Sequence, residues 1–298
     1  MSDPKDHHYI PVFYLKRWVN PATGKLIQYS KIREKLISKP VGPKATGFEH
    51  LLYSFPDLPP ELQHVLEAKF FNGADNLAAK ALEQLYARDH QWTADIRSAW
   101  SRFIINLYIR HPDPLKEVKQ RIRDDWGKTD TITEQEYARA KPEGFPDTFA
   151  EYLETLGPGM TARVQLRLVQ GALDNERLGQ RINNMLWRVI DVSSSPYELL
   201  TSDWPADLQL ARGMLALPIG PHHLFVAANT EEQMQQVMKA RKAKLVAAIN
   251  LYVVASARRF VWARTENQEN FILRHIHTGM RPQPFFPSLT LLAKTSKT

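Results

Sequence analysis

The sequence predicts an α+β protein that is mostly helical, with a small mixed or antiparallel sheet built from N-terminal and C-terminal strands. Three observations support this prediction. Long stretches in the middle of the chain place apolar residues three or four positions apart, as one face of a helix requires. Short apolar runs separated by proline and glycine stand at both ends and are typical of strands. Hydrophobic residues make up 43% and charged residues 24% of the chain, which is ordinary for a globular protein.

Length and composition exclude several classes of protein. The 298 residues are near the upper limit for one hydrophobic core, so we expect one compact domain, in which a lobe boundary would fall near residues 157–160. The absence of cysteine excludes disulfides, thiolate metal sites and cysteine nucleophiles. The longest uncharged apolar run, residues 245–257, is shorter than the roughly 20 residues that span a membrane. The polar N-terminus shows no secretory signal, which favours a bacterial, cytoplasmic protein.

The first part of the chain has the pattern of a hairpin. Residues 9–19 are aromatic and β-branched, residues 20–24 form an Asn-Pro turn signal ending in Gly24, and residues 26–30 resume an apolar run. Residues 56–60 contain prolines that end this segment. This predicts extended structure up to that point.

Helical periodicity follows. It predicts a helix over residues 61–88 with a bend at Gly73, and a second helix that begins after Thr93 as N-cap and ends at Arg110-His111-Pro112. A basic helix over residues 115–126 comes next. Thr133 and Glu136 are spaced as the capping box of another helix.

Gly157-Pro158-Gly159 is the strongest break in the middle of the chain, and the residues after it have the length and composition of one long helix over 160–192. Three short apolar runs then predict strands. Thr230 and Gln233 form a capping box for a helix to about residue 257, and a last strand follows. The predicted strands cover residues 197–201, 214–219, 224–228 and 258–264, and the proline-containing tail from residue 282 is expected to be ordered only by docking.

The pentapeptide His7-His8-Tyr9-Ile10-Pro11 is the first candidate for chemistry. Adjacent side chains of a strand point to opposite faces, so His7 and His8 cannot both enter one site. Histidine titrates near neutrality, which suits His8 to the role of a general base or ligand, with Tyr9 beside it as a binding residue. The alternative is a polar terminus that flanks a strand.

A second candidate is Ser202-Asp203-Trp204-Pro205, where a predicted strand ends in polar residues. Asp203 can act as an acid or base, position a histidine or bind a metal. Equally, Ser202 and Asp203 can close an Asx-type turn. In that case Asp203→Asn should cost little stability, since asparagine also caps such turns. If Asp203 is catalytic, the same change should lower the free energy of unfolding by less than about 1.5 kcal/mol and abolish the activity.

Basic residues supply the remaining candidates. Arg110 ends an apolar helix, where a cation interacts favourably with the helix dipole, and it can alternatively hold an anion. Lys116, Lys119 and Arg123 lie on the basic helix that follows and can contact a polyanion, although a solvated helix face is the default explanation for them. The net charge of +7 favours nucleic acid as a partner only weakly. The recognisable spacings of phosphate-binding glycine loops, zinc proteases and serine hydrolases are not found in the sequence.

Taken together, the opening residues, the Arg110-His111-Pro112 helix end and the Ser202–Pro205 segment resemble the bacterial domain-of-unknown-function family 4238 (DUF4238). The resemblance spans about residues 7–264. It implies that His8 and Pro11, Arg110 and Pro112, and Ser202, Asp203 and Pro205 are the positions to test, and it implies no reaction. His111 stands where other members often carry threonine.

Two functional hypotheses follow. In the first, the protein hydrolyses phosphodiesters of nucleic acid: His8 and Asp203 act as acid and base or hold a metal, and Arg110 holds the anion. In the second, the protein is a non-enzymatic module that binds nucleic acid or protein, and the same motifs are structural. The sequence does not decide whether the protein is an enzyme, and it indicates neither a cofactor, a metal nor an oligomeric state.

Overall fold

The computed structural model describes residues 6–54, 71–87, 92–125 and 131–277. The first part of the helix predicted over residues 61–88 and the tail from residue 282 lie outside the described residues. Ten strands and eleven α-helices are seen in the described part, with all the strand pairs antiparallel. The predicted α+β class is therefore confirmed.

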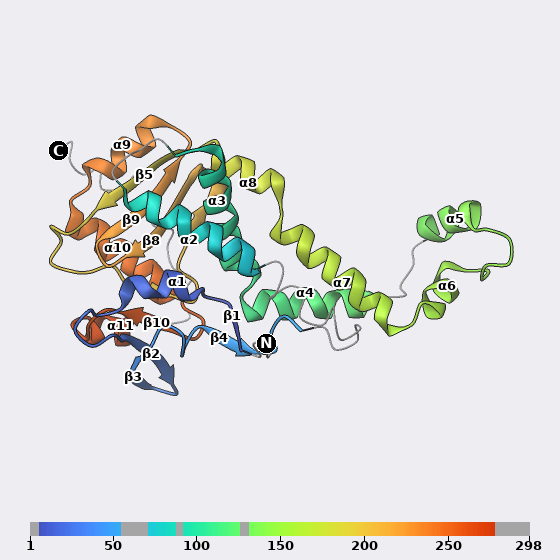
Figure 1. The fold of residues 1–298 in the computed structure, drawn as a ribbon, viewed down its shortest axis with the longest axis horizontal. Coiled ribbons are helices and arrows are strands. Elements are labelled where there is room, and N and C mark those ends of the chain that lie inside the picture. The colour runs from blue at the N-terminus through green and yellow to red at the C-terminus, as the bar shows by residue number, and fades with distance from the viewer. Residues whose placement is uncertain (1–5, 55–70, 88–91, 126–130, 278–298) are drawn as a thin grey trace.

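The main sheet has the strand order β5-β9-β8-β7 and lies between two layers of helices (Figure 1). Its strands are β5 (Leu186–Asp191), β7 (Asp207–Gln209), β8 (Met214–Gly220) and β9 (His223–Ala228). Leu215, Leu217 and Phe225 pack with α2 (Asn72–Tyr86) and α3 (Ala94–Ile109) on one face. Ala216 and Val226 pack with α9 (Glu231–Lys239) and α10 (Lys242–Ser256) on the other. Because both faces are covered, β8 is an uninterrupted apolar run in which every residue is buried.

The second sheet has the order β3-β2-β10-β6 and joins the two ends of the described chain. It consists of β2 (Leu26–Ile32), β3 (Lys35–Val41), β6 (Thr201–Ser202) and β10 (Val261–Ala263), with Val261 opposite both Tyr29 and Ser202. Helix α11 (Glu269–His275) contacts α10 beside this sheet. A two-stranded sheet of β1 (Asp6–His8) and β4 (Phe48–His50) completes the strands.

The prediction of extended structure over residues 9–19 is wrong. Helix α1 (Val12–Leu15) and the short 3-10 helix η1 (Lys16–Trp18) occupy this segment. Tyr14 and Trp18, four residues apart and thus on one side of a helix, are buried and donate hydrogen bonds to the carbonyls of Pro218 and Leu199. The hairpin partner of β2 is instead β3, which sequence pattern did not reveal because most of its residues are exposed on both faces.

The single long helix predicted over residues 160–192 is also wrong. The segment contains α7 (Pro158–Leu173), α8 (Glu176–Asn183) and strand β5. Asp174 is the C-terminal cap of the first helix, and Asn175 caps the second by accepting a hydrogen bond from the Leu178 amide at 2.9 Å. The capping box of Thr230 and Gln233 is confirmed, but the chain becomes extended at Ala240 and Arg241, so two helices follow it rather than one.

Four helices form an arm that stands away from the body of the protein (Figure 1). Helices α4 (Pro112–Asp125) and α7 lie side by side, and they carry α5 (Thr131–Ala140) and α6 (Phe149–Thr155) at their far end. The expected capping box at Thr133 is not at a helix start, because α5 begins at Thr131. Thr148 and Glu151 form such a box at α6 instead. The lobe boundary predicted near residue 157 falls where α6 is followed by α7, and it stays a prediction.

Gly213 and Gly24 allow a direct test of the close contact at the start of β8. Both have positive φ, +72° and +68°, which costs alanine about 1–2 kcal/mol. A Cβ at Gly213 would also lie 2.6 Å from Asn229 Nδ2, whereas a Cβ at Gly24 meets nothing within 4 Å. We therefore expect Gly213→Ala to lower the free energy of unfolding by at least about 1 kcal/mol more than Gly24→Ala does, measured by urea denaturation. Equal losses of stability in the two variants would show that the close contact between Gly213 and Asn229 does not constrain this position.

Candidate functional site

The three polar segments singled out by the sequence lie close together where β1, α3 and β6 end. Arg110 is the C-terminal cap of α3 and contacts the backbone of His8, while His111 faces Asp203, the residue after β6. Residues separated by about a hundred positions along the chain thus share one polar cluster. Its members are almost all buried in the protein.

His7 and His8 point to opposite sides of β1, as strand geometry predicts. His7 is buried, stacks on the ring of Tyr53 at 5.3 Å and accepts a hydrogen bond from the Tyr53 amide at its Nδ1. His8 is partly exposed, and its Nε2 lies 3.3 Å from the carbonyl oxygen of Lys44. Burial is the main cause that lowers the pKa of His8, so this imidazole favours its neutral form.

Arg110 is a buried cation with several partners inside the protein. Its Nη1 lies 2.7 Å from Asp75 Oδ1 and its Nη2 3.2 Å from Asp75 Oδ2, so the pair is bidentate. Nη2 also donates to the carbonyl of His8 at 2.7 Å, and the guanidinium lies over the ring of Phe71. Burial opposes the charge, but Asp75 and Tyr53 outweigh it and raise the pKa of Arg110 above its ordinary value. These contacts fasten β1 and α2 to the end of α3.

Asp203 holds the chain between α10 and β10. Its Oδ1 accepts from the Arg258 amide at 2.8 Å, and its Oδ2 accepts from the amides of Arg259 and Phe260 at 2.7 and 3.3 Å. The expected turn is present, but Ser202 closes it by accepting from the Trp204 amide. The carboxylate of Asp203 therefore does not serve the turn: it stabilises a segment more than fifty residues away.

His111 and Tyr9 complete the buried cluster around Asp203. The Nδ1 of His111 accepts from the Asp113 amide at 3.2 Å, which assigns the proton of the neutral ring to Nε2. Nε2 lies 3.7 Å from Asp203 Oδ2, beyond hydrogen-bonding distance. The ring of Tyr9 lies 5.3 Å from that of His111. Burial and then the charge of Asp203 raise the pKa of Tyr9, whose hydroxyl has no hydrogen-bond partner among the described residues.

Glu49 forms the outer edge of the cluster. It lies between two cations, 2.6 Å from Lys116 Nζ and 2.7 Å from Arg259 Nη1. Burial opposes ionisation of this carboxyl, but the hydrogen bonds from Lys116 and Arg259 outweigh it and lower the pKa of Glu49. The charge of Lys116, predicted as a binding residue, thus has a partner within the protein.

The other predicted binding lysine, Lys119, donates to the carbonyls of Leu52 and Ser54 at 3.1 and 3.2 Å. With Lys116 it lines a groove of about 600 Å³ between β4 and α4. Arg123 lies on α4, and its side chain is outside the described part of the structure. Binding roles for these three residues and for Tyr9 and Ser202 stay predictions.

Metal binding and catalysis receive no geometric support from the described residues. Among them, no group of three His, Asp or Glu side chains is placed to hold a metal ion. Asp203, His111 and Arg110 are at most 1% exposed, so a substrate has no path to them without rearrangement of the fold. The catalytic roles predicted for His8, Arg110 and Asp203 stay predictions.

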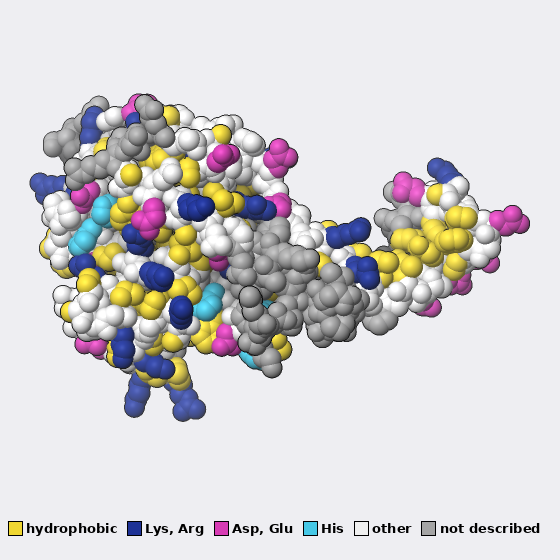
Figure 2. Space-filling model, in the orientation of Figure 1, with side chains coloured by type: hydrophobic (Ala, Val, Ile, Leu, Met, Phe, Trp, Pro, Cys, Tyr) yellow, Lys and Arg dark blue, Asp and Glu magenta, His cyan; other side chains and the backbone are white. Residues whose placement is uncertain are grey.

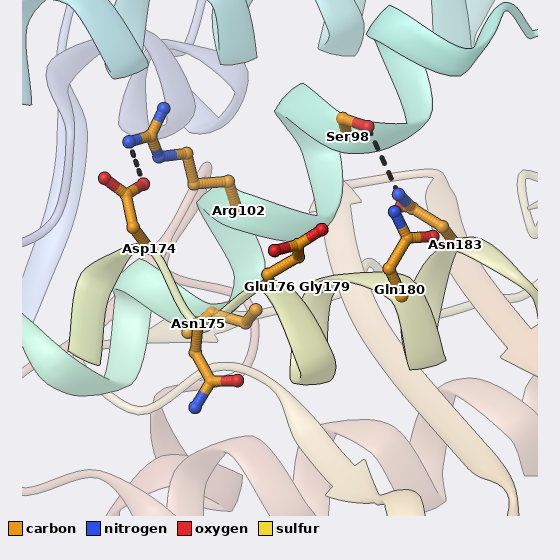
Figure 3. A pocket seen from close by; sticks show the side chains of 9 residues that line it. Ser98, Arg102, Asp174, Asn175, Glu176, Gly179, Gln180 and Asn183 are labelled. Atoms are coloured by element: carbon orange, nitrogen blue, oxygen red, sulfur yellow. Dashed lines mark hydrogen bonds and ion pairs between the residues drawn. The ribbon is translucent and has the colours of Figure 1, made fainter. Parts of the chain in front are cut away.

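A separate cleft of about 170 Å³ lies between α3 and α8 (Figure 3). Arg102 and Asp174 form an ion pair at one end, and Asn183 donates to Ser98 Oγ at 3.2 Å at the other. Residues predicted from the sequence to carry chemistry do not line this cleft. These two interactions pair four of the polar side chains that line the cleft.

Sequence reasoning missed the partners that give these motifs their role. Asp75, Glu49, Arg259 and Tyr53 lie in segments with no unusual composition, and the family resemblance favours threonine at the position of His111. A buried arginine at a helix end implies a carboxylate partner, but nothing in the sequence shows which one.

Comparison with known proteins gives a family and no activity. The sequence profile of the family described as "Protein of unknown function (DUF4238)" matches residues 6–267. No curated protein and no solved structure matches the chain. In the part of the chain that the structure describes, no helix combines the length and apolar character needed to cross a membrane.

Asp203→Asn tests the structural role of the carboxylate. Because both oxygens accept backbone N–H groups, an amide nitrogen would face a donor in any orientation. We expect the free energy of unfolding to fall by about 2–3 kcal/mol, more than a turn former would lose. Urea denaturation measures this, with Asp147→Asn as a control that loses only an exposed ion pair with Lys141 and should lower the midpoint only slightly. A midpoint for Asp203→Asn equal to that of the control would refute the assignment.

Arg110→Lys tests the bidentate bridge. Lysine keeps the charge but cannot bond both oxygens of Asp75 and the His8 carbonyl in the same planar arrangement. We expect a loss of about 2–4 kcal/mol in the free energy of unfolding. Arg121→Lys, in an exposed ion pair with Glu117, is the matched substitution and should cost less than about 0.5 kcal/mol. Comparable losses in the two variants would show that Arg110 is not the link between β1 and α2.

Proposed function

We propose that this chain, which belongs to the DUF4238 family of proteins of unknown function, is a nucleic-acid-binding module that contacts duplex DNA through its β2–β3 hairpin (residues 25–41). The buried motifs then serve to hold the fold, as the second sequence hypothesis states. A bacterial, cytoplasmic setting, in which such a ligand is present, is part of the same proposal.

The geometry of the hairpin is the observation that carries the proposal. Strand β3 is at the edge of its sheet, and Arg33 and Glu34 join it to β2 in a two-residue connection. Lys35, Ile37 and Lys39 alternate along β3 and therefore point to one face, which Ile32 shares through its pairing with Lys35. Ile32 is 59% and Ile37 43% exposed. Two isoleucines and two lysines thus form one exposed face on a projecting ribbon.

The hairpin is strongly basic. It contains five basic residues and one acidic residue. Lys31 pairs with that acidic residue, Glu34, at 3.3 Å. The four other cations have no acidic partner among the residues that the structure describes, and they are Lys25, Arg33, Lys35 and Lys39. Figure 2 shows Lys and Arg side chains gathered at the free end of this hairpin.

A ribbon of this shape and charge fits a DNA groove. The major groove is about 12 Å wide and accepts a two-stranded β-ribbon. Lys35 and Lys39, four residues apart on one strand, are separated by about 13 Å, which allows them to contact phosphates across such a groove. Arg33 at the hairpin end has a φ of +53°, as the first central residue of a two-residue hairpin turn requires. Lysine contacts of this kind supply affinity rather than base sequence specificity.

The phosphodiester hydrolase, the first sequence hypothesis, has less support from the contacts. Arg110 is bonded to Asp75 and His8, and Asp203 to three backbone amides, so neither is available to a phosphate in this conformation. Binding requires only the exposed ribbon. We therefore favour the module over the enzyme.

Fluorescence anisotropy of a short labelled DNA duplex tests the proposal. We expect the logarithm of the association constant to fall linearly with the logarithm of salt concentration, since phosphate contacts release counterions. In Lys35→Gln/Lys39→Gln protein the slope should be smaller by about 1.8, two contacts at about 0.9 each, with weaker binding at low salt. The matched control, Lys239→Gln/Lys244→Gln, removes the same charge from exposed positions near α9 and α10 and should leave the slope unchanged.

The proposal fails if the wild type does not bind at low salt, or if both double variants lose affinity equally. Incubating the same duplex with Mg²⁺ or Mn²⁺ separates the two hypotheses. Cleavage products that appear with the wild type and disappear with Asp203→Asn would favour the hydrolase.

A further inference from the structure

The end of the arm carries an aromatic surface that has no core beneath it. We call residues 134–157, which include most of α5 and all of α6, the tip. Four rings contact one another there at centroid distances of 5.4 to 6.2 Å, and they belong to Tyr137, Phe145, Phe149 and Tyr152. None of these residues is buried, and Phe145 is 44% exposed. An exposed apolar cluster of this kind marks an interaction site.

The tip is nevertheless a defined structure. Glu134 accepts hydrogen bonds from the Phe149 and Ala150 amides, which caps the start of α6, and Thr148 and Glu151 form a capping box. Tyr137 and Lys141 both donate to the carbonyl of Pro146. The aromatic surface therefore has a fixed shape before any partner binds, which lowers the entropic cost of docking.

Charge identifies the partner surface. The tip contains six acidic and two basic residues, a net charge of −4, within a chain of net charge +7. The β2–β3 hairpin has the opposite character, with five basic residues, one acidic residue and the exposed side chains of Ile32 and Ile37. An acidic aromatic surface and a basic aliphatic surface are complementary in both charge and polarity.

We propose that the tip docks on the β2–β3 hairpin of a second copy of this chain, and that the two copies exchange arms in a reciprocal dimer. The tip cannot reach its own hairpin, because the arm holds it on the opposite side of the body (Figure 1). Contact between two tips would bring two surfaces of charge −4 together and is disfavoured. A two-fold dimer pairs each tip with the other hairpin, and so uses both surfaces of both copies. The inference does not rest on the proposed function.

Sedimentation equilibrium and light scattering of the purified chain, over about 10 to 200 µM, test the dimer. We expect association that weakens as salt rises from about 50 to about 500 mM, since the contacts are between exposed charges. Phe145→Ser should weaken it at all salt concentrations by removing apolar contact. A wild type that stays monomeric over the whole range would overturn the proposal.

A charge exchange identifies the two surfaces. Glu143→Lys/Glu154→Lys reverses charges on the tip, and Lys35→Glu/Lys39→Glu reverses charges on the hairpin; all four side chains are exposed. Each variant alone should be monomeric, because both of its contacts pair a surface of net charge zero with a charged one. Their mixture should form a one-to-one dimer, because the unchanged tip of one variant, of net charge −4, then meets the unchanged hairpin of the other, of net charge +4. The mixture also shows that both variants are folded. Lys239→Glu/Lys244→Glu is the control that should dimerise as the wild type does.

Association that survives either reversal, or a mixture that does not associate, would exclude the hairpin of a second copy as the occupant of the tip. DNA binding separates this inference from the proposed function. Because the tip and the duplex would occupy the same face of the hairpin, the tip variant, which no longer dimerises, should bind the labelled duplex at least as tightly as the wild type, whereas failure of DNA binding leaves the dimer experiment unaffected.

Discussion

The fold depends on placing one positive charge, the guanidinium of Arg110, inside the protein. A buried cation is costly unless its surroundings supply both a counter-charge and hydrogen-bond acceptors. Asp75 on α2 supplies the charge, and the backbone of His8 on β1 supplies an acceptor. Each requirement constrains a different element, so Arg110 fixes where the N-terminal strand and α2 meet the end of α3. The guanidinium also lies over the ring of Phe71 and donates a hydrogen bond from Nε to the hydroxyl of Tyr53.

The cluster continues from Arg110 to strands β6 and β10. His111 follows Arg110 and faces Asp203. Asp203 in turn accepts hydrogen bonds from three backbone amides in the segment that leads into β10. Strand β10 lies between β2 and β6. Elements from the start, the middle and the end of the chain are thus connected through polar atoms that are shielded from water. Shielding strengthens each of these interactions and makes the loss of any one partner expensive. This explains why three short motifs, far apart in sequence, occur together in one chain without forming an open site.

Sequence pattern was sufficient where structure is local. The helix after Thr93, the strands near residues 214–219 and 224–228 and the capping box at Thr230 follow from periodicity and capping alone. Sequence pattern was insufficient where tertiary contacts determine the backbone conformation. Residues 9–19 are rich in strand-forming side chains yet become helical, since Tyr14 and Trp18 must reach Pro218 and Leu199. Residues 186–191 extend because β9 offers them a partner. The motifs themselves were recognisable as unusual, but their partners were not, because Asp75 and Glu49 are ordinary residues in ordinary segments.

The distribution of unpaired charge separates the residues that hold the fold from those that are free to interact. Buried Arg110 and Asp203, and Glu49 at the edge of the cluster, have their hydrogen bonds within the chain and have little left to offer a ligand. Away from this cluster, the β2–β3 hairpin presents cations without acidic partners among the described residues, beside exposed isoleucines. The tip presents excess acid beside exposed aromatic rings. Both surfaces combine charged side chains with exposed apolar side chains, and both project from the body of the protein. Their apolar side chains therefore do not pack in the core. The arm keeps the rings and the isoleucines of one copy apart, so they cannot bury one another. The free energy of burying these side chains can therefore be gained only by binding a partner.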